Sequence, residues 1–165
     1  MKKILLVFCL LIFGCGYKPL SKVSKNILGD KIYSYVSTSI NDPQNSVIIQ
    51  DALKEAIVSR FGGSLVPRQK AESILHVNIK SVNFIPTIYD QNGYVVSYKA
   101  KLILETKTTF ANGQTSSYDA RGEYDFDIQA NSVISDSKRF KAIKLSSLSA
   151  LDEYIAFIAV KGMRD

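Results

Sequence analysis

The sequence predicts an α+β fold, a two-layer sandwich in which a four-stranded, mainly antiparallel sheet carries two helices on one face, in the order β-α-β-β-β-α. Three observations support this prediction. Two stretches repeat apolar residues with helical spacing, later stretches alternate apolar and polar residues, and two X-Asn-Gly sequences separate the alternating stretches. One apolar sheet face and two apolar helix faces cover each other in such a sandwich.

A strand and a helix open the domain. Residues 31–40 are rich in Tyr, Val, Ile, Ser and Thr, which is typical of a strand. Asp42-Pro43 indicates a helix start, because Asp caps and Pro fits the first turn, and Ser46 is a second candidate cap. Apolar residues then recur at every fourth position: Ile49, Leu53 and Ile57. Gly62-Gly63 ends the helix, since glycine adopts left-handed backbone angles at little cost.

The second strand changes face partway along its length. Its first apolar residues share one parity: Leu75, Val77 and Ile79. Its later ones have the other parity: Val82, Phe84 and Ile88. Because strand side chains alternate, the change requires a bulge or a twist at Lys80-Ser81. Pro86 cannot donate to a ladder, so we expect this part of the strand to lie at a sheet edge.

The third and fourth strands alternate without interruption. Their inward positions are Tyr94, Val96, Tyr98, Ala100, Leu102 and Leu104 on the third, and Tyr118, Ala120, Gly122, Tyr124, Phe126 and Ile128 on the fourth. Their outward positions are Ser97, Lys99, Lys101, Glu105 and Lys107 on the third, and Asp119, Arg121, Glu123, Asp125 and Asp127 on the fourth. The pattern therefore predicts one apolar and one charged sheet face.

The turn between these strands sets their register. A two-residue Asn-Gly turn would pair Ala111 with Gln114 and set inward residues opposite outward ones. A three-residue loop with Gly113 in the left-handed conformation pairs Phe110 with Gln114 and restores parity. The same loop is expected at Gln91-Asn92-Gly93.

This register brings opposite charges together at two places, Lys101 with Glu123 and Lys99 with Asp125. Its weak point is Glu105 opposite Asp119, two like charges. A register shifted by two residues removes that conflict but loses the glycine placement, and both registers stay open at this point.

The last segment, residues 137–161, predicts a second helix that Gly162 ends. Its apolar stripe consists of Ile143, Leu148, Leu151, Ile155 and Ile158. Phe140 and Phe157 lie near the stripe.

The first residues have the layout of a secretory signal. Two lysines precede an apolar run from Ile4 to Phe13, which is about half the length that a bilayer-spanning helix needs. The sequence Ile12-Phe13-Gly14-Cys15 resembles a bacterial lipobox, in which the cysteine is acylated and begins the mature chain. Ordinary secretion with a chance cysteine is the alternative. We expect residues 1–14 to be a lipoprotein signal peptide, 15–30 a lipidated tether and 31–165 a single α+β domain.

Charge and cysteine content narrow the classes of function. Net charge is +6, and loss of Lys2 and Lys3 with the leader leaves +4, a mild surplus that fits an anionic partner or a membrane surface. A nucleic-acid partner is not expected for an exported protein. Once Cys9 leaves with the leader, Cys15 is the only cysteine, so we expect neither a disulfide nor a thiolate zinc site.

The residues needed for catalysis or cofactor binding are not evident. His76 is the only histidine and is interpreted as a half-exposed strand residue rather than a base. The outward carboxylates Glu123, Asp125 and Asp127 either bind a cation or, more simply, pair with the neighbouring lysines. Residues 90–93 resemble a calcium loop only in part, and turn chemistry explains them. We therefore expect no enzyme activity, no cofactor and no metal.

Two regions are candidates for partner binding. Strands of about sixteen residues reach roughly 50 Å, whereas a helix of about twenty covers roughly 30 Å, so the long hairpin should project beyond the helices. Its tip carries Tyr89, Tyr94 and Tyr98, which either meet a partner or cover the edge of their own sheet. The outward cations either meet phosphate groups or form salt pairs with the acidic strand: Lys99, Lys101, Lys107 and Arg121.

Three motifs in order resemble the LptE family of lipopolysaccharide-assembly lipoproteins. They are Cys15-Gly16-Tyr17-Lys18-Pro19, Asp42-Pro43-Gln44-Asn45-Ser46 before a helix, and Asp90-Gln91-Asn92-Gly93-Tyr94 between long strands. The resemblance covers nearly the whole mature chain, and the order of elements matches that family's sandwich.

This resemblance implies a non-catalytic lipoprotein anchored through Cys15 on the periplasmic side of the outer membrane. It implies an LptD-type outer-membrane β-barrel as partner, which the protein plugs and helps to assemble, and lipopolysaccharide as the transported ligand. Gly16 agrees with outer-membrane sorting as the family rule is stated. Only Cys15 transfers as a site residue. The alternative is another small envelope lipoprotein that acts as a scaffold for a cell-wall or transporter complex.

Overall fold

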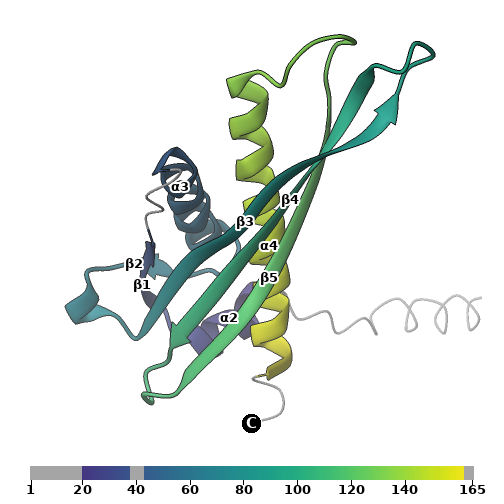
Figure 1. The fold of residues 1–165 in the computed structure, drawn as a ribbon. Helices are drawn as coiled ribbons and strands as arrows, with labels where there is room; N and C mark the ends of the chain where they lie inside the picture. Colours follow the sequence, from purple (N-terminus) through teal and green to yellow (C-terminus); the bar gives the residue numbers. More distant parts are fainter. Residues whose placement is uncertain (1–19, 38–42, 162–165) are drawn as a thin grey trace, which may run out of the picture.

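A computed structural model describes residues 20–37 and 43–161. Its elements are α2 (Leu20–Leu28), β1 (Lys31–Val36), α3 (Pro43–Ser59), β2 (Ser64–Leu65), the 3-10 turn η1 (Arg68–Lys70), β3 (Ser73–Tyr89), β4 (Val95–Thr109), β5 (Thr115–Asp127) and α4 (Asp136–Lys161). Figure 1 shows the three long strands passing in front of α4, with the helices gathered behind the sheet. The α+β class and the helix-covered sheet face are confirmed.

The sheet differs from the prediction in its strand number and direction. It has five strands in the order β2-β1-β3-β4-β5, not four. β1 runs parallel to both β2 and β3, whereas β3, β4 and β5 form an antiparallel meander, so the sheet is mixed. The fifth strand, Ser64–Leu65, was missed because two residues are too short to show an alternating pattern.

The helix count also differs, because the structure describes three α-helices rather than two. α2 occupies Leu20–Leu28, within the segment expected to be the lipidated tether, for which no helix was predicted. The face that α2 buries includes Ser24 and Leu28, and the Ser24 hydroxyl donates to the Phe61 carbonyl oxygen at 3.2 Å. The spacing of Leu20, Val23, Ile27 and Leu28 is that of an amphipathic helix, so the sequence carried the signal and the prediction overlooked it.

The core lies between the sheet and helices α3 and α4. Its buried members include Leu53 and Ile57 on α3, Leu102 and Leu104 on β4, and Leu151, Ile155 and Ile158 on α4. The phenol of Tyr154 is buried and lies 2.5 Å from the Thr108 hydroxyl oxygen. Burial raises the pKa of Tyr154 well above its ordinary value, and the hydrogen bond to Thr108 opposes that shift. The predicted apolar faces of both long helices are confirmed.

The predicted turns and the first register are confirmed. The Phe110 amide donates to the Gln114 carbonyl oxygen at 2.9 Å, and Gly113 has a φ of 78°. The ladder pairs Lys101 with Glu123, so the register that places two acidic residues face to face is the one adopted. Between Ile79 and Ser81 the β3–β4 pairing shifts by one residue, so the face change at Lys80 is a bulge.

Helix α4 approaches β5 most closely at Gly122. A Cβ placed on Gly122 would overlap the carbonyl oxygen of Ser146 and lie 2.6 Å from the amide nitrogen of Ala150. Glycine at this inward position therefore lets the backbones of helix and strand nearly touch. This contact fixes the part of α4 that covers the sheet.

The β3–β4 hairpin extends past the helix layer. Along β3, side chains change from buried near Ser73 to exposed from Ile85 to Tyr89. Figure 1 shows the hairpin tip standing clear of α4 at one end, while α2 lies toward the other. The predicted projection is confirmed.

Candidate functional site

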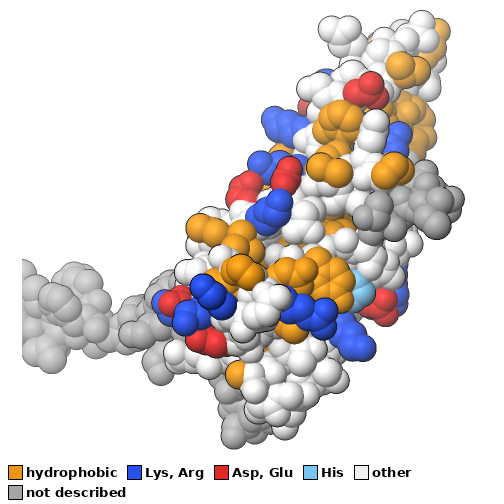
Figure 2. All heavy atoms as spheres, turned by 90° about the vertical axis from the view of Figure 1, so that its left-hand side faces the viewer, with side chains coloured by type: hydrophobic (Ala, Val, Ile, Leu, Met, Phe, Trp, Pro, Cys, Tyr) orange, Lys and Arg blue, Asp and Glu red, His pale blue; other side chains and the backbone are white. Residues whose placement is uncertain are grey.

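The sheet face that points away from the helices carries the charged residues of β3, β4 and β5, and we call it the open face. Its cations are Lys80, Lys99, Lys101, Lys107 and Arg121, and its anions are Glu105, Asp119, Glu123, Asp125 and Asp127. The five positive and five negative charges balance. The open face points toward the viewer in Figure 1; Figure 2, turned by 90°, shows the molecule from the left-hand side of that view, where charges of both signs lie among exposed hydrophobic side chains.

Lys80 resolves the like-charge conflict of the adopted register. Its Nζ lies 2.8 Å from Asp119 Oδ2 and 3.8 Å from Glu105 Oε1, so one ammonium group serves two carboxylates on two strands. The hydrogen bond to Asp119 is the main cause that raises the pKa of Lys80. Lys80 is the unpaired residue of the bulge, and its side chain lies on the open face within reach of both anions.

A second ion-pair group surrounds Glu123. Lys99 Nζ lies 2.9 Å from Glu123 Oε2 and 3.8 Å from Asp125 Oδ2, and Lys101 Nζ lies 3.2 Å from Glu123 Oε1. Hydrogen bonds from Lys99 and Lys101 lower the pKa of Glu123, and the bond to Glu123 raises the pKa of Lys99. Of the two alternatives stated for the outward cations, Lys99 and Lys101 therefore form salt pairs with the acidic strand β5.

The other two predicted cations differ from these lysines. Arg121 and Lys107 are exposed, and neither forms an ion pair with any residue that the structure describes. The structure thus places all four predicted cations on one face. Two of them, Lys99 and Lys101, are paired with carboxylates, and the other two, Lys107 and Arg121, are not paired with any described residue. Unpaired cations keep their full charge for an external anion.

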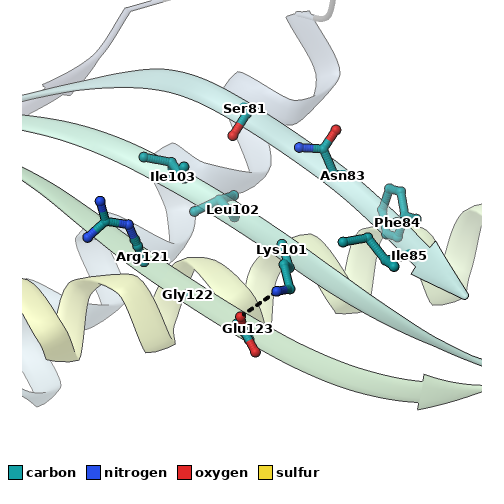
Figure 3. Close-up of a pocket in the computed structure, with 10 residues that line it drawn as sticks. All are labelled: Ser81, Asn83, Phe84, Ile85, Lys101, Leu102, Ile103, Arg121, Gly122 and Glu123. Carbon is teal, nitrogen blue, oxygen red and sulfur yellow. Dashed lines mark ion pairs between the residues drawn. The ribbon is translucent and has the colours of Figure 1, made fainter. Parts of the chain in front are cut away.

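A hollow of about 440 Å³ lies on the open face beside Arg121. Ile85 and Ile103 contribute aliphatic surface to it, and Asn83 adds a polar side chain. Figure 3 shows the Lys101–Glu123 pair at one side of the hollow and Arg121 apart from that pair. The site therefore combines an apolar patch with one unpaired cation, which suits an amphiphilic ligand with an anionic group.

Sequence reasoning missed Ile85 and Ile103 as site residues. Both occupy outward positions on strands whose other outward residues are mostly polar, and Ile85 is 42% exposed. The signal in the sequence was an apolar residue at a position where the alternation of the strand predicts a polar, outward-facing one.

The hairpin tip presents a second candidate surface. Ile88, Tyr89 and Tyr94 are 55%, 58% and 45% exposed. Hydrogen bonds hold the turn below them: the Asp90 carboxylate accepts from the amides of Asn92 and Tyr94 at 2.9 and 2.8 Å. We call these three exposed side chains the tip patch; an exposed apolar cluster of this kind is a candidate interaction surface.

Tyr98 does not belong to the tip patch. Its ring faces the helix side and stacks against Phe126, with ring centroids 6.1 Å apart and an interplanar angle of 21°. It covers its own sheet, which was the alternative stated for the tip tyrosines.

His76 lies on the open face near β1 and is held by neighbours. Its Nε2 is 2.5 Å from the Ser37 hydroxyl oxygen, and its ring stacks on Tyr35 at 4.4 Å between centroids. These contacts occupy the imidazole in a structural role.

Three further findings concern expected sites. Within residues 20–37 and 43–161, no group of three metal-ligating side chains comes together. No helix in the same ranges has the length and apolar character needed to cross a membrane. Cys15, predicted to be acylated, and the leader lie outside the described residues.

Comparison with solved structures shows the same fold in bacterial lipoproteins. Rare lipoprotein B from Shewanella oneidensis has a TM-score of 0.51 and 11% identity, with 81% of this chain and 97% of that chain covered. A putative lipoprotein from Caulobacter crescentus has a TM-score of 0.53 and 11% identity, with coverages of 87% and 95%. Because only 11% of the aligned residues are identical, these comparisons show that the proteins share a fold and nothing more. No curated protein matches the sequence.

A family profile gives the assignment. The profile described as LptE, lipopolysaccharide-assembly, matches residues 34–148, more than half of the 165 residues. The matched region contains α3, the whole β3–β5 meander with its open face and tip, and the first half of α4. The chain therefore belongs to the LptE family of lipopolysaccharide-assembly proteins.

Proposed function

We propose that the mature chain is a lipoprotein of the outer membrane, anchored through Cys15, that plugs an LptD-type barrel, helps to assemble it and assists lipopolysaccharide transport to the outer leaflet. The family match over residues 34–148 is the observation that carries the proposal. The role is non-catalytic: the protein contributes binding surfaces and a rigid shape.

The two ends of the molecule support a plug. Cys15 precedes α2 by five residues, a reach of at most about 18 Å, and α2 lies toward the end opposite the tip patch. The 17 residues of β3 extend roughly 55 Å, compared with about 30 Å for the hydrocarbon layer of a membrane. If the lipid on Cys15 lies in the inner leaflet, β3 is long enough to place the tip patch at the far side of a barrel lumen.

The open face supports contact with lipopolysaccharide. Of the four cations predicted to meet phosphate groups, we assign Arg121 and Lys107 to that role, because Lys99 and Lys101 already have carboxylate partners. The hollow beside Arg121 offers aliphatic surface for part of an acyl chain.

Co-purification tests the barrel partnership. We expect the native lipidated chain, extracted in mild detergent, to bring down a large barrel protein in equimolar amount. A photo-crosslinker at Tyr94 should give that barrel as its main adduct, whereas one at Val58, which is also exposed but lies on α3, serves as the comparison position. A monomeric chain beside an intact barrel would contradict the proposal, and an adduct with a cell-wall or transporter complex would favour the scaffold alternative.

Binding of purified lipopolysaccharide tests the ligand assignment. Arg121→Gln should weaken binding about three- to tenfold, because a charge-assisted bond is lost. Lys101→Gln is the matched control on the neighbouring strand and should change binding less. If the two variants weakened binding equally, the claim that unpaired cations bind the ligand more strongly than paired ones would be wrong.

A further inference from the structure

β3 has strands on both sides only along its first part. β1 pairs with β3 from Ser73 to Val77, and beyond Val77 no strand in the described ranges pairs with the side of β3 that faces away from β4. The later part of β3, up to Tyr89, is therefore a sheet edge. Native proteins usually shorten, charge or cover such edges, because they are templates for pairing with another chain.

Hydrogen bonds around β4 show which way its backbone groups point. The amide of Phe110 donates to Gln114 O, and the amide of Ile128 donates to Val96 O, both at 2.9 Å. In an antiparallel ladder the N–H and C=O of one residue face the same neighbour, and those of the next residue face the other. Even-numbered residues of β4 therefore bond to β5, and odd-numbered ones bond to β3.

The direction of the β3 groups follows from this alternation. The odd β4 residues Ile103, Lys101 and Lys99 pair with Ser81, Asn83 and Ile85 of β3. The backbone groups of these three β3 residues thus face β4. Those of the residues between and after them, Val82, Phe84 and Pro86, face the edge.

The positions of Pro86 and Lys80 agree with this assignment. Proline has no N–H to donate and is tolerated where that group would face outward. The bulge at Lys80 exchanges the odd- and even-numbered residues whose backbone groups face β4. Before the bulge, the backbone groups of odd-numbered residues should therefore face β1. Val77 agrees, because its carbonyl oxygen accepts a hydrogen bond from the Ser37 amide at 2.9 Å. The edge between bulge and proline offers two amide donors, Val82 and Phe84, and three carbonyl acceptors.

The sequence of this edge favours pairing. Residues 81–89 carry no charged side chain and are rich in β-branched and aromatic residues. The opposite sheet edge, β5, is treated differently: Glu153 of α4 accepts a hydrogen bond from the Arg121 amide at 2.8 Å and one from the Tyr118 hydroxyl at 2.6 Å. A helix side chain thus occupies an outward amide of the β5 edge, whereas no described side chain donates to or accepts from the β3 edge between Val82 and Pro86. Beyond Pro86 the β3–β4 pairing shifts twice before the tip patch.

We infer that residues 81–86 of β3 form a strand-addition site, which an extended, uncharged, β-branched or aromatic segment of the barrel partner occupies. This inference rests on the proposed function for the identity of the partner. The argument for that partner is proximity: Pro86 lies three residues before Tyr89, about 10 Å along the strand, so a protein bound at the tip patch can extend a segment along the edge toward Phe84 and Val82. Backbone hydrogen bonds would supply affinity, and side-chain alternation would select an apolar segment.

Amide exchange of single residues tests the inference. In the isolated lipidated chain in detergent, the amides of Asn83 and Ile85 should exchange slowly and those of Val82 and Phe84 rapidly. In the complex with co-expressed barrel, the amides of Val82 and Phe84 should slow by at least about tenfold. Unchanged exchange at both would overturn the inference, as would slow exchange at both in the isolated chain.

Two variants test the same edge by affinity. Val82→Pro removes an outward donor without touching the β4 ladder, and Ile85→Lys adds a charge beside the edge. Each should keep the chain folded and weaken capture of the barrel about tenfold. Asn83→Pro is the control for direction, because it removes a donor to β4 and should lower the unfolding midpoint more than Val82→Pro does.

The results separate the two proposals. If the wild-type chain captures no barrel, the proposed function fails. If the wild type, Val82→Pro and Ile85→Lys capture equal amounts, only strand addition fails. A wild-type chain that forms a dimer which Val82→Pro dissociates would overturn the choice of occupant in favour of a second copy.

Discussion

A single lysine makes the observed strand register compatible with its charges. Glu105 and Asp119 face each other across β4 and β5, and Lys80 reaches both from β3. Lys80→Met should lower the unfolding midpoint, because two carboxylates then repel without a shared cation. Thermal unfolding at low and high salt measures the effect, which should shrink as salt screens the repulsion.

Lys107→Met is the matched control for Lys80→Met. Lys107 lies on the same face but has no ion pair in the described ranges, so its loss should leave the midpoint nearly unchanged. Equal shifts for both variants would show that the three-strand charge group does not contribute to stability.

Glu123 gives the open face a defined pH response. Lys99 and Lys101 lower its pKa below the ordinary value of about 4.3. A carboxylate with a lowered pKa stabilises the fold above its unfolded pKa, and this contribution is lost as the pH falls through the folded pKa. The midpoint of Glu123→Gln should therefore fall less than that of wild type between about pH 5 and pH 2.

Asp127→Asn provides the comparison for the acid titration. The Asp127 carboxylate forms no ion pair with residues in the described part of the chain. Its replacement should leave the slope of midpoint against pH close to that of wild type. A slope that changes equally in both variants would contradict a specific role for the Glu123 pairs.

Residue-level prediction succeeded where side chains alternate and failed at the irregular position. The pairing of Lys101 with Glu123 followed from parity and one glycine turn. Lys80 was not assigned to a face, because a bulge suspends alternation and only the folded backbone shows where its side chain points. The division of the four cations into paired and unpaired groups likewise depends on side-chain reach, which the sequence does not contain.

Among the elements, α4 depends on one glycine of β5. Gly122→Ala should destabilise the fold by about 2 kcal/mol or more, because the added methyl meets helix backbone rather than a movable side chain. Chemical denaturation measures the change. Gly113→Ala is the comparison: it meets open space but has positive φ, and should cost about 1 kcal/mol. A smaller effect at Gly122 than at Gly113 would contradict the close approach.

Long elements were predictable and short ones were not. α3 occupies Pro43–Ser59 and α4 occupies Asp136–Lys161, close to the ranges that their apolar stripes predicted, while the predicted caps Asp42 and Gly162 lie outside the described residues. α2 was missed although Leu20, Val23, Ile27 and Leu28 have helical spacing, because the prediction assigned its whole segment to the tether. β2 could not be predicted, since its two residues form a strand only through their pairing with β1. The parallel direction of β1 is also a tertiary property.

For the whole molecule, stability should be concentrated at the helix-covered part of the sheet. Leu104→Ala removes a fully buried side chain and should cost about 2 to 5 kcal/mol of unfolding free energy. Ile88→Ala in the tip patch should cost about 0.5 kcal/mol or less. Denaturant titration of both variants gives the comparison, and a large loss at Ile88 would show that the hairpin tip packs on the core.

The balanced charges of the open face have a consequence for how anions find it. The long strands hold equal numbers of cations and anions, so the net surplus of the sequence comes from residues outside these strands. Such a face produces little field beyond a Debye length, about 8 Å in physiological salt. Association rates for an anionic molecule at this face should accordingly vary little with ionic strength, and discrimination should reside in how long the molecule stays rather than how fast it arrives.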